Sequence, residues 1–135
     1  MYRDMIIDET RKIALIIAKL MGIKAQVTRQ EFADELENVL KEEYNAELEE
    51  LINLTEAEFN ALIVSDQYNA DKLNALSQMF YMFAEPFKND VETQLLLKKV
   101  LAIFDVLEQK HRFQSFDNIN KRNTIYKYLE LGYEQ

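Results

Sequence analysis

The only residue pair spaced like part of a metal site is Glu108 and His111, and His111 is the single histidine of the chain. Glu-x-x-His spacing places both side chains on one face of a helix, as the carboxylate-bridged di-metal sites of helical bundles require. Those sites also need a second Glu-x-x-His pair, which a chain with one histidine cannot supply. We therefore interpret His111 as a polar residue near the C-terminal end of a helix.

The remaining polar residues do not form a catalytic set either. Acid pairs such as Asp34 with Glu37 lie opposite apolar stripes, and this favours solvated carboxylates over an acid–base pair. One histidine allows only one serine triad, no glycine-rich phosphate loop occurs, and a chain without cysteine has neither disulfides nor thiolate zinc sites. We expect a protein that is not an enzyme, with no catalytic residue, no cofactor and no metal.

The elements that carry these residues are expected to be helices. The 135 residues are 48% apolar and 30% charged, which is enough apolar material for one folded core. Two glycines and one proline are too few for many β-hairpins. We predict a single all-α domain over residues 1–135, with six or seven helices in antiparallel pairs or an irregular bundle.

Helix signals divide the chain into three segments. An apolar N-terminal helix is predicted over residues 1–22, with Gly22 as its C-terminal cap. Acidic helices follow over residues 28–64, and residues 69–133 are predicted to form a helix pair followed by a C-terminal helix.

Capping residues mark several of the helix starts. Thr28 and Thr55 each begin a capping box, with glutamates three residues later. Asn45 is interpreted as the cap of a short helix. The C-terminal helix is predicted to begin near Ser115 or Asp117 and to bury one stripe of side chains: Phe116, Ile119, Tyr126, Leu129 and Tyr133.

The N-terminal helix has more apolar surface than one small core would cover. Residues 13–18 are apolar all round, and Leu15 lies in the middle of the face that carries Arg11 and Lys19. We expect one side of this helix to pack on the core and part of the other side to meet a partner. The candidate interface residues are Leu15, Arg11, Lys19 and Ile16, joined by two tyrosines that fall off the main apolar stripe further along the chain, Tyr81 and Tyr68.

An aromatic helix follows the acidic segment. Phe80, Phe83 and Phe87 recur at spacings of three and four residues, which is typical of a core stripe. The same residues are also suited to line a pocket for a small molecule, because apolar pockets with a few polar groups are the usual ligand sites.

Charge excludes some classes of partner. The net charge is −8, and an acidic surface repels phosphate backbones, so we expect no nucleic acid partner. Residues 31–58 hold eleven acids and one base, whereas residues 98–128 hold seven bases and three acids, so the two regions are able to complement each other. We find no export signal and no transmembrane segment, and with no cysteine present we expect a cytoplasmic protein.

Two resemblances follow from these patterns. The segment Leu73-Asn-Ala-Leu76-Ser77-Gln-Met-Phe80 resembles the first helix of a tetratricopeptide repeat, and this implies TPR-like packing of helix pairs over about 40 residues. The order of an apolar helix, an acidic connector and a helix pair ending in Phe113-Gln-Ser-Phe-Asp117 resembles a group of small bacterial all-helical proteins. Neither resemblance implies an activity.

Three functional hypotheses remain open. The first is a non-catalytic protein–protein interaction or scaffolding module that self-associates, as a dimer, through its N-terminal helix. The second is a small-ligand receptor or enzyme whose pocket is lined by the helix of Phe80, Phe83 and Phe87. The third is a peripheral membrane protein that lies on lipid through its N-terminal helix, although the acidity of the chain makes a membrane surface an unfavourable partner.

Overall fold

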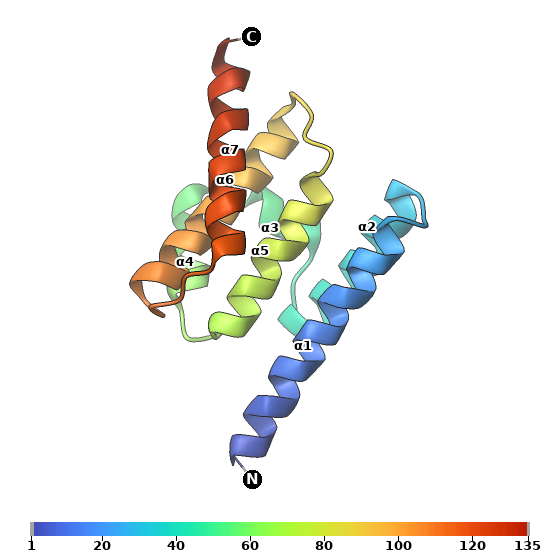
Figure 1. Ribbon diagram of the computed structural model, residues 1–135, viewed down its shortest axis with the longest axis vertical. Coiled ribbons are helices and arrows are strands. Elements are labelled where there is room, and N and C mark those ends of the chain that lie inside the picture. The colour runs from blue at the N-terminus through green and yellow to red at the C-terminus, as the bar shows by residue number, and fades with distance from the viewer. Residues whose placement is uncertain (1, 135) are drawn as a thin grey trace. The chain divides into compact units, whose positions relative to one another are not determined.

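The computed structural model describes the backbone of residues 2–134 and the side chains of residues 11–130. Over this part of the chain it consists of seven helices and no strand, which confirms the all-α prediction (Figure 1). The helices are α1 (Tyr2–Lys24), α2 (Arg29–Tyr44), α3 (Leu48–Asn53), α4 (Glu56–Val64), α5 (Ala70–Ala84), α6 (Val91–Gln109) and α7 (Phe116–Glu134).

Contacts along the chain group these helices into two compact units, Met1–Asn53 and Leu54–Gln135. The first unit contains α1 to α3, and the second contains α4 to α7. The expectation of a single domain over residues 1–135 stays a prediction.

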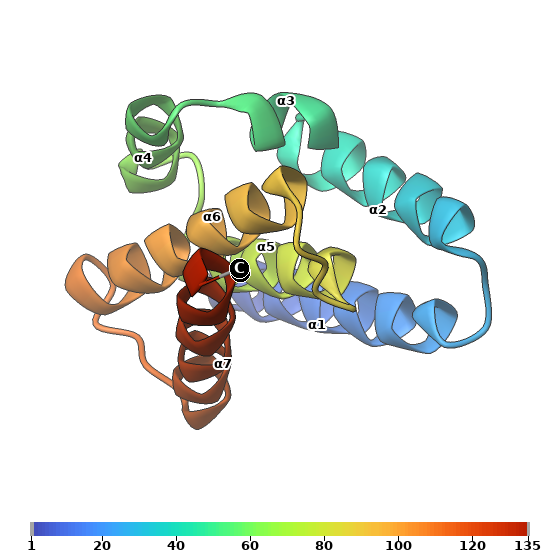
Figure 2. The ribbon, with the colours of Figure 1, turned by 90° about the horizontal axis from the view of Figure 1, so that it is seen from above.

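In the first unit, α1 and α2 form an antiparallel hairpin (Figure 2). The turn between them is held by the amides of Gln26 and Val27, which both donate to the carbonyl of Ile23, at 2.9 and 3.1 Å. The expected end of α1 at Gly22 is therefore wrong, because the helix continues to Lys24. A glycine inside a helix costs about 1 kcal/mol relative to alanine, which is too little to end a helix whose neighbours stay helical.

Helix α2 begins and ends at strong local signals. The Thr28 hydroxyl accepts a hydrogen bond from the Glu31 amide at 3.1 Å, as the capping pattern predicts. At the other end, Asn45 has a positive φ of 51° and its amide donates to the Leu40 carbonyl. Asn45 thus caps the end of α2, and its interpretation as the start of α3 is wrong. Asparagine tolerates the left-handed region, which suits the residue that follows a helix.

A part-buried hydrogen bond to a carboxylate joins α2 to α3 instead. The amide of Leu48, the first residue of α3, donates to Oε1 of Glu37 at 2.9 Å. The side chains of α2 that are buried repeat every four residues: Phe32, Leu36, Leu40 and Tyr44.

In the second unit, α5 and α6 run in opposite directions and pack along their length (Figures 1 and 2). Their contact is the core of the unit, because Leu76, Phe80, Leu97 and Val100 are all fully buried. Asn69 caps α5 through its side chain, which agrees with the predicted start of this segment at residue 69. Pro86 follows the end of α5 at Ala84.

Helix α7 buries a different face from the predicted one. Phe116 and Tyr126 are 87% and 52% exposed, whereas Asn118 and Ile125 are buried. The expected stripe is therefore wrong for these two aromatic residues, and Tyr133 lies outside the described side chains. Asn118 is buried because its side-chain amide forms hydrogen bonds with two residues of α5. These polar contacts determine which face of α7 packs inward.

Candidate functional site

The exposed side of α1 is mainly apolar: between Ala14 and Gly22, Lys19 is the one charged residue among the exposed side chains. Leu15 and Met21 are 64% and 61% exposed, so most of the surface of these two large apolar side chains is in contact with solvent. They share one helical face with smaller exposed residues, and we define this set as the α1 face: Ala14, Leu15, Ala18, Met21, Gly22 and Ala25.

The other side of α1 is apolar as well. Ile13, Ile17, Leu20 and Ile23 recur at helical spacing and are half-buried or buried, with Leu20 only 1% exposed. Because α1 packs against α2 within this unit, one stripe of α1 serves the fold while the α1 face remains uncovered.

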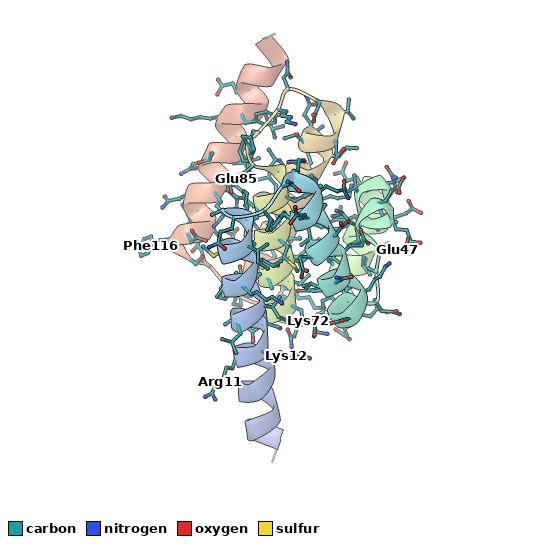
Figure 3. All side chains as sticks on the ribbon, turned by 90° about the vertical axis from the view of Figure 1, so that its right-hand side faces the viewer. Arg11, Lys12, Glu47, Lys72, Glu85 and Phe116 are labelled. Carbon is teal, nitrogen blue, oxygen red and sulfur yellow. The ribbon has the colours of Figure 1, made fainter. Side chains whose placement is uncertain are left out.

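The four candidate interface residues of α1 do not all share one surface. Leu15 belongs to the α1 face, and Arg11 is exposed on the same face seven residues before Ala18. Lys19 is exposed at the edge of the face, and Ile16 is half-buried. Figure 3 shows Arg11 extending away from the helix. The neighbouring Lys12 forms an ion pair with Glu43 of α2, with 3.0 Å between Nζ and Oε1.

Gly22 has open space around it. A Cβ atom added at this position would meet nothing within 4 Å. The fold within the described residues therefore has no steric need for glycine here, although glycine lowers helix stability relative to alanine. A missing side chain on an exposed helix face permits close approach by another helix.

The two candidate tyrosines belong to the second unit and have different surroundings. Tyr68 is only 6% exposed, so its expected role in an exposed contact is wrong; burial also raises the pKa of its hydroxyl. Tyr81 is half-buried and packs edge-to-face against Phe87, with 5.3 Å between the ring centroids. Burial raises the pKa of Tyr81 too. The six candidates therefore fall into two units and form no single site within either one.

The aromatic side chains of α5 are packed rather than open to a ligand. Phe80 is fully buried and Phe83 is 7% exposed, so both belong to the core. Phe87, beyond the end of α5, contacts the ring of Tyr128 in α7 as well as Tyr81. None of the three phenylalanines lines the groove that the structure shows elsewhere in this unit.

That groove lies between α4 and α6 and has a volume of about 810 Å³. Its charged lining residues are Glu56 and Asp105 together with the adjacent Lys98 and Lys99. Its walls are mainly apolar and include Leu54, Phe59, Val64, Leu95, Ala102 and Val106.

Lys99 is the most constrained charged group of the groove. It is 6% exposed, its Nζ donates to the Leu54 carbonyl at 3.0 Å, and its ammonium lies 5.4 Å from the centre of the Phe59 ring. Burial lowers the pKa of this amine because it disfavours the charged form. The sequence analysis missed Lys99, although its position three residues after Leu96 and four before Ile103 places it on the buried stripe of α6.

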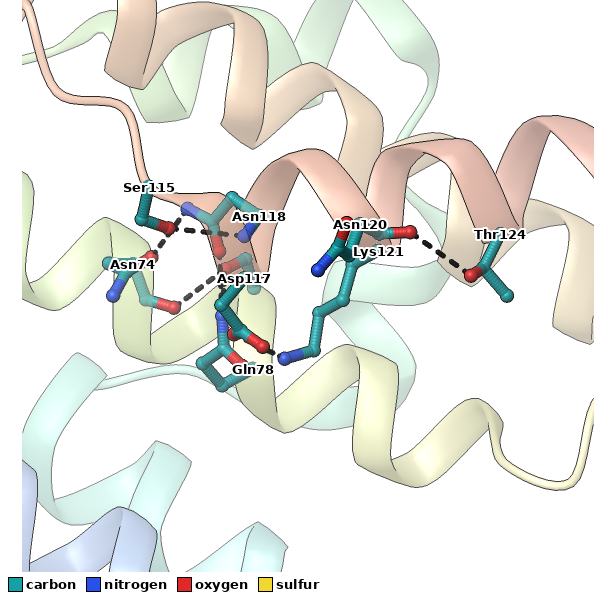
Figure 4. A network of polar contacts seen from close by, with 9 residues as sticks. Asn74, Gln78, Ser115, Asp117, Asn118, Asn120, Lys121 and Thr124 are labelled. Atoms are coloured by element: carbon teal, nitrogen blue, oxygen red, sulfur yellow. Dashed lines mark hydrogen bonds and ion pairs between the residues drawn. The ribbon is translucent and has the colours of Figure 1, made fainter.

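A second polar group lies between α5 and α7, where Asn118 bridges two residues of α5 (Figure 4). Its Nδ2 donates to Oδ1 of Asn74 at 2.9 Å, and its Oδ1 accepts from Nε2 of Gln78 at 3.1 Å. The backbone N–H of Asn118 donates to the Ser115 hydroxyl at 3.1 Å. Because these groups satisfy one another, the network positions α7 and offers little to a ligand.

The Glu108 and His111 pair does not form a site. Helix α6 ends at Gln109, so His111 lies beyond the helix that carries Glu108. The Glu108 carboxylate accepts from a guanidinium nitrogen of Arg122 at 2.6 Å, and this hydrogen bond is the main reason why the pKa of Arg122 is raised. Among the described residues, no three acidic or histidine side chains are grouped so as to hold a metal ion.

Within the described part of the chain, no helix has the length and apolar character to cross a membrane. Comparison of the chain with protein families, with curated proteins and with solved structures found no match.

Proposed function

We propose that this chain is a non-catalytic protein–protein interaction module that self-associates as a dimer through the α1 face. The observation that carries this proposal is the exposure of Leu15 and Met21 on a helix face that is mainly apolar between Ala14 and Ala25. Removing apolar surface from water contributes roughly 25 cal/mol per Å², so an uncovered stripe of this kind favours association.

Gly22 supports a helix as the occupant of the face. Neighbouring side chains set how closely two helix axes approach, and the distance is shortest where small residues meet. Ala14, Ala18, Gly22 and Ala25 provide such a surface beside the two large side chains. Glycine destabilises the helix of the single chain, but in the dimer it allows the two helices to approach closely.

The spacing of the α1 face is self-complementary in an antiparallel pair. If two copies cross with Ala18 opposite Ala18, Leu15 of each copy lies at the level of Met21 of the other, and Ala14 lies at the level of Gly22. Large side chains then meet across the twofold axis beside gaps left by small ones, as a symmetric interface requires. In this register Arg11 lies at the level of Ala25, and Lys19 stays at the edge in solvent.

The dimer is expected to be weak and to depend on concentration. A single helix pair buries less surface than a standard stable interface, which covers about 800 Å² per partner. Each copy also carries a net charge of −8, which opposes association at low salt.

The decisive experiment measures the solution mass of the full chain over a wide range of concentrations, by light scattering and sedimentation. We expect a concentration-dependent dimer that Leu15→Glu abolishes, because the substitution buries a charge in the interface. Asn38→Glu adds the same charge at an exposed position of α2 and is the matched control. A wild-type monomer at all concentrations, or a dimer unaffected by Leu15→Glu, would contradict the proposal.

Gly22→Ala separates association from folding. It should stabilise the single chain by up to about 1 kcal/mol and weaken the dimer, because an added methyl group separates the two helices. A destabilised fold with unchanged association would count against a contact at Gly22.

A lipid surface is the rival occupant of the α1 face. Two basic residues, Arg11 on the face and Lys19 at its edge, favour an anionic membrane as such an occupant. The face lacks aromatic anchors, and the net charge of the chain repels anionic lipids, so we expect no co-sedimentation with anionic vesicles at low salt. The proposal retains the cytoplasm as the expected compartment and TPR-like helix pairing as an interpretation of α5 and α6.

A further inference from the structure

The groove between α4 and α6 combines an apolar wall with two amino groups at adjacent positions of α6. Phe59, Ala102 and Val106 contribute to the wall, and Lys98 and Lys99 contribute the amino groups. We propose that this groove binds a small molecule with an apolar body and a single carboxylate, and that Lys99, assisted by Lys98, receives the carboxylate.

The hydrogen bonding of Lys99 leaves room for such a ligand. A lysine ammonium has three N–H donors, and the Leu54 carbonyl accepts one of them at 3.0 Å. Within the described residues no second acceptor is recorded for this amine, so two donors remain for a carboxylate. Because the side chain is buried, a hydrogen bond to an anion there is stronger than the same bond in water.

The acidic residues that line the groove do not neutralise the charges of the two lysines. Asp105 forms an ion pair with Arg122, at 3.1 Å between Oδ1 and a guanidinium nitrogen. Glu56 is exposed in the first turn of α4, where solvent and the helix N-terminus stabilise its charge. An incoming carboxylate is therefore attracted mainly by Lys98 and Lys99.

The size of the groove fits a small molecule. Its volume of about 810 Å³ lies within the range of roughly 300 to 1,000 Å³ that is typical of small-ligand sites. Phe59 lines the groove but is 1% exposed, so the apolar body of a ligand packs mainly on the more exposed side chains of Val64 and Val106.

A bound carboxylate changes the protonation equilibrium of Lys99. Burial lowers the pKa of Lys99 in the free protein, and a bound carboxylate opposes this effect because it favours the ammonium form. Ligand binding should therefore raise the pKa of Lys99, and affinity should fall as the pH rises through that pKa.

The test compares three probes with the same chain length, octanoate, octanol and octylammonium, by calorimetry and by NMR shifts of the Ala102 and Val106 amides in the full chain. We expect octanoate to bind at least about tenfold more tightly than octanol, since a charge-assisted hydrogen bond contributes that much, and octylammonium to bind least. Equal binding of octanoate and octanol, or no shift at either amide, would overturn the proposal.

Variants of the lysines locate the contact. Lys99→Met and Lys98→Met should each weaken octanoate binding, Lys99→Met by about tenfold or more, and leave octanol binding unchanged. Lys127→Met removes an exposed lysine of α7 that does not line the groove, and it should have no effect.

Ala102→Phe is the second variant, because Lys99→Met leaves the Leu54 carbonyl without its partner and can disturb the fold. The larger side chain fills the groove and should abolish binding of both octanoate and octanol while the lysines stay in place. Unchanged octanoate affinity in a folded Ala102→Phe or Lys99→Met variant would show that the ligand does not occupy this groove.

Discussion

Helix α6 presents two sides with opposite character. Towards α5, its side chains Leu97, Val100 and Phe104 are at most 1% exposed. Towards α4, the side chains Leu95 and Ala102 remain half-buried and line the groove. The same helix thus contributes to a closed core on one side and to an open apolar surface on the other.

Helix length accounts for this difference. Helix α6 has 19 residues and α5 has 15, whereas α4 has only nine. At 1.5 Å per residue, α4 is roughly half as long as α6 and is therefore too short to cover the whole of that side. The core thus depends on packing across α5 and α6, while the α4 side depends on local contacts that hold a short helix in place.

The strongest test of this contrast is truncation on each side of α6. Phe80→Ala should lower the free energy of unfolding by about 3 to 5 kcal/mol, because it leaves a cavity in a fully buried core. Val106→Ala in the groove wall should cost less than about 1 kcal/mol, since solvent already reaches that side chain. Urea unfolding followed by circular dichroism measures both, and similar losses of unfolding free energy would show that the two sides of α6 do not differ.

The polar contact of α7 with α5 is the second test. Asn118→Leu should cost about 1 to 3 kcal/mol, because it removes the partner of both Asn74 and Gln78 without changing the size of the residue greatly. Asn123→Leu at an exposed position of α7 is the control and should change stability by at most about 0.5 kcal/mol. Equal effects of the two substitutions would mean that the network contributes nothing.

The sequence predicted the features that depend on nearby residues. The Thr55 capping box, the start of α5 at Asn69 and the apolar stripe through Leu73, Leu76 and Phe80 are all found in the structure. Each depends on residues three or four positions apart, and such spacings are visible in the sequence itself. The all-α class follows from the same periodicity.

The features that sequence analysis missed depend on contacts between distant segments. The inward face of α7 is decided by Asn118 and its partners 40 and 44 residues earlier, so the aromatic pattern of α7 was misleading. The burial of Tyr68 and the α4–α6 groove have the same origin. Among the missed features only Lys99 has a local signal in the sequence, because it lies inside the apolar stripe of α6.

The third test concerns how α4 is held. The Thr55 hydroxyl accepts a hydrogen bond from the Glu58 amide at 3.1 Å, and the Thr55 amide donates to Glu58 Oε1 at 2.9 Å. Thr55→Ala should cost about 1 kcal/mol, while Thr55→Ser, which retains the hydroxyl, should cost little. If the alanine and serine variants unfold at the same urea concentration, the cap does not hold α4.

The smallest expected effect is the response of this cap to acid. The hydrogen bond from the Thr55 amide lowers the pKa of Glu58, because it favours the ionised carboxylate. A carboxyl group whose pKa is lower in the folded state stabilises the fold at pH values above its unfolded pKa of about 4.3, and this contribution is lost as the pH falls through the folded pKa.

Urea unfolding of the wild type and of Glu58→Gln should therefore differ at neutral pH and converge as the pH falls below the folded pKa of Glu58. Glu130→Gln removes one negative charge from an exposed position of α7 and controls for the change in net charge alone. A difference between wild type and Glu58→Gln that stays constant from neutral pH down into strong acid would show that the Glu58 carboxylate takes no part in holding the start of α4. The α4 side of α6 would then depend on packing like the α5 side, and the contrast between the two sides would be one of degree.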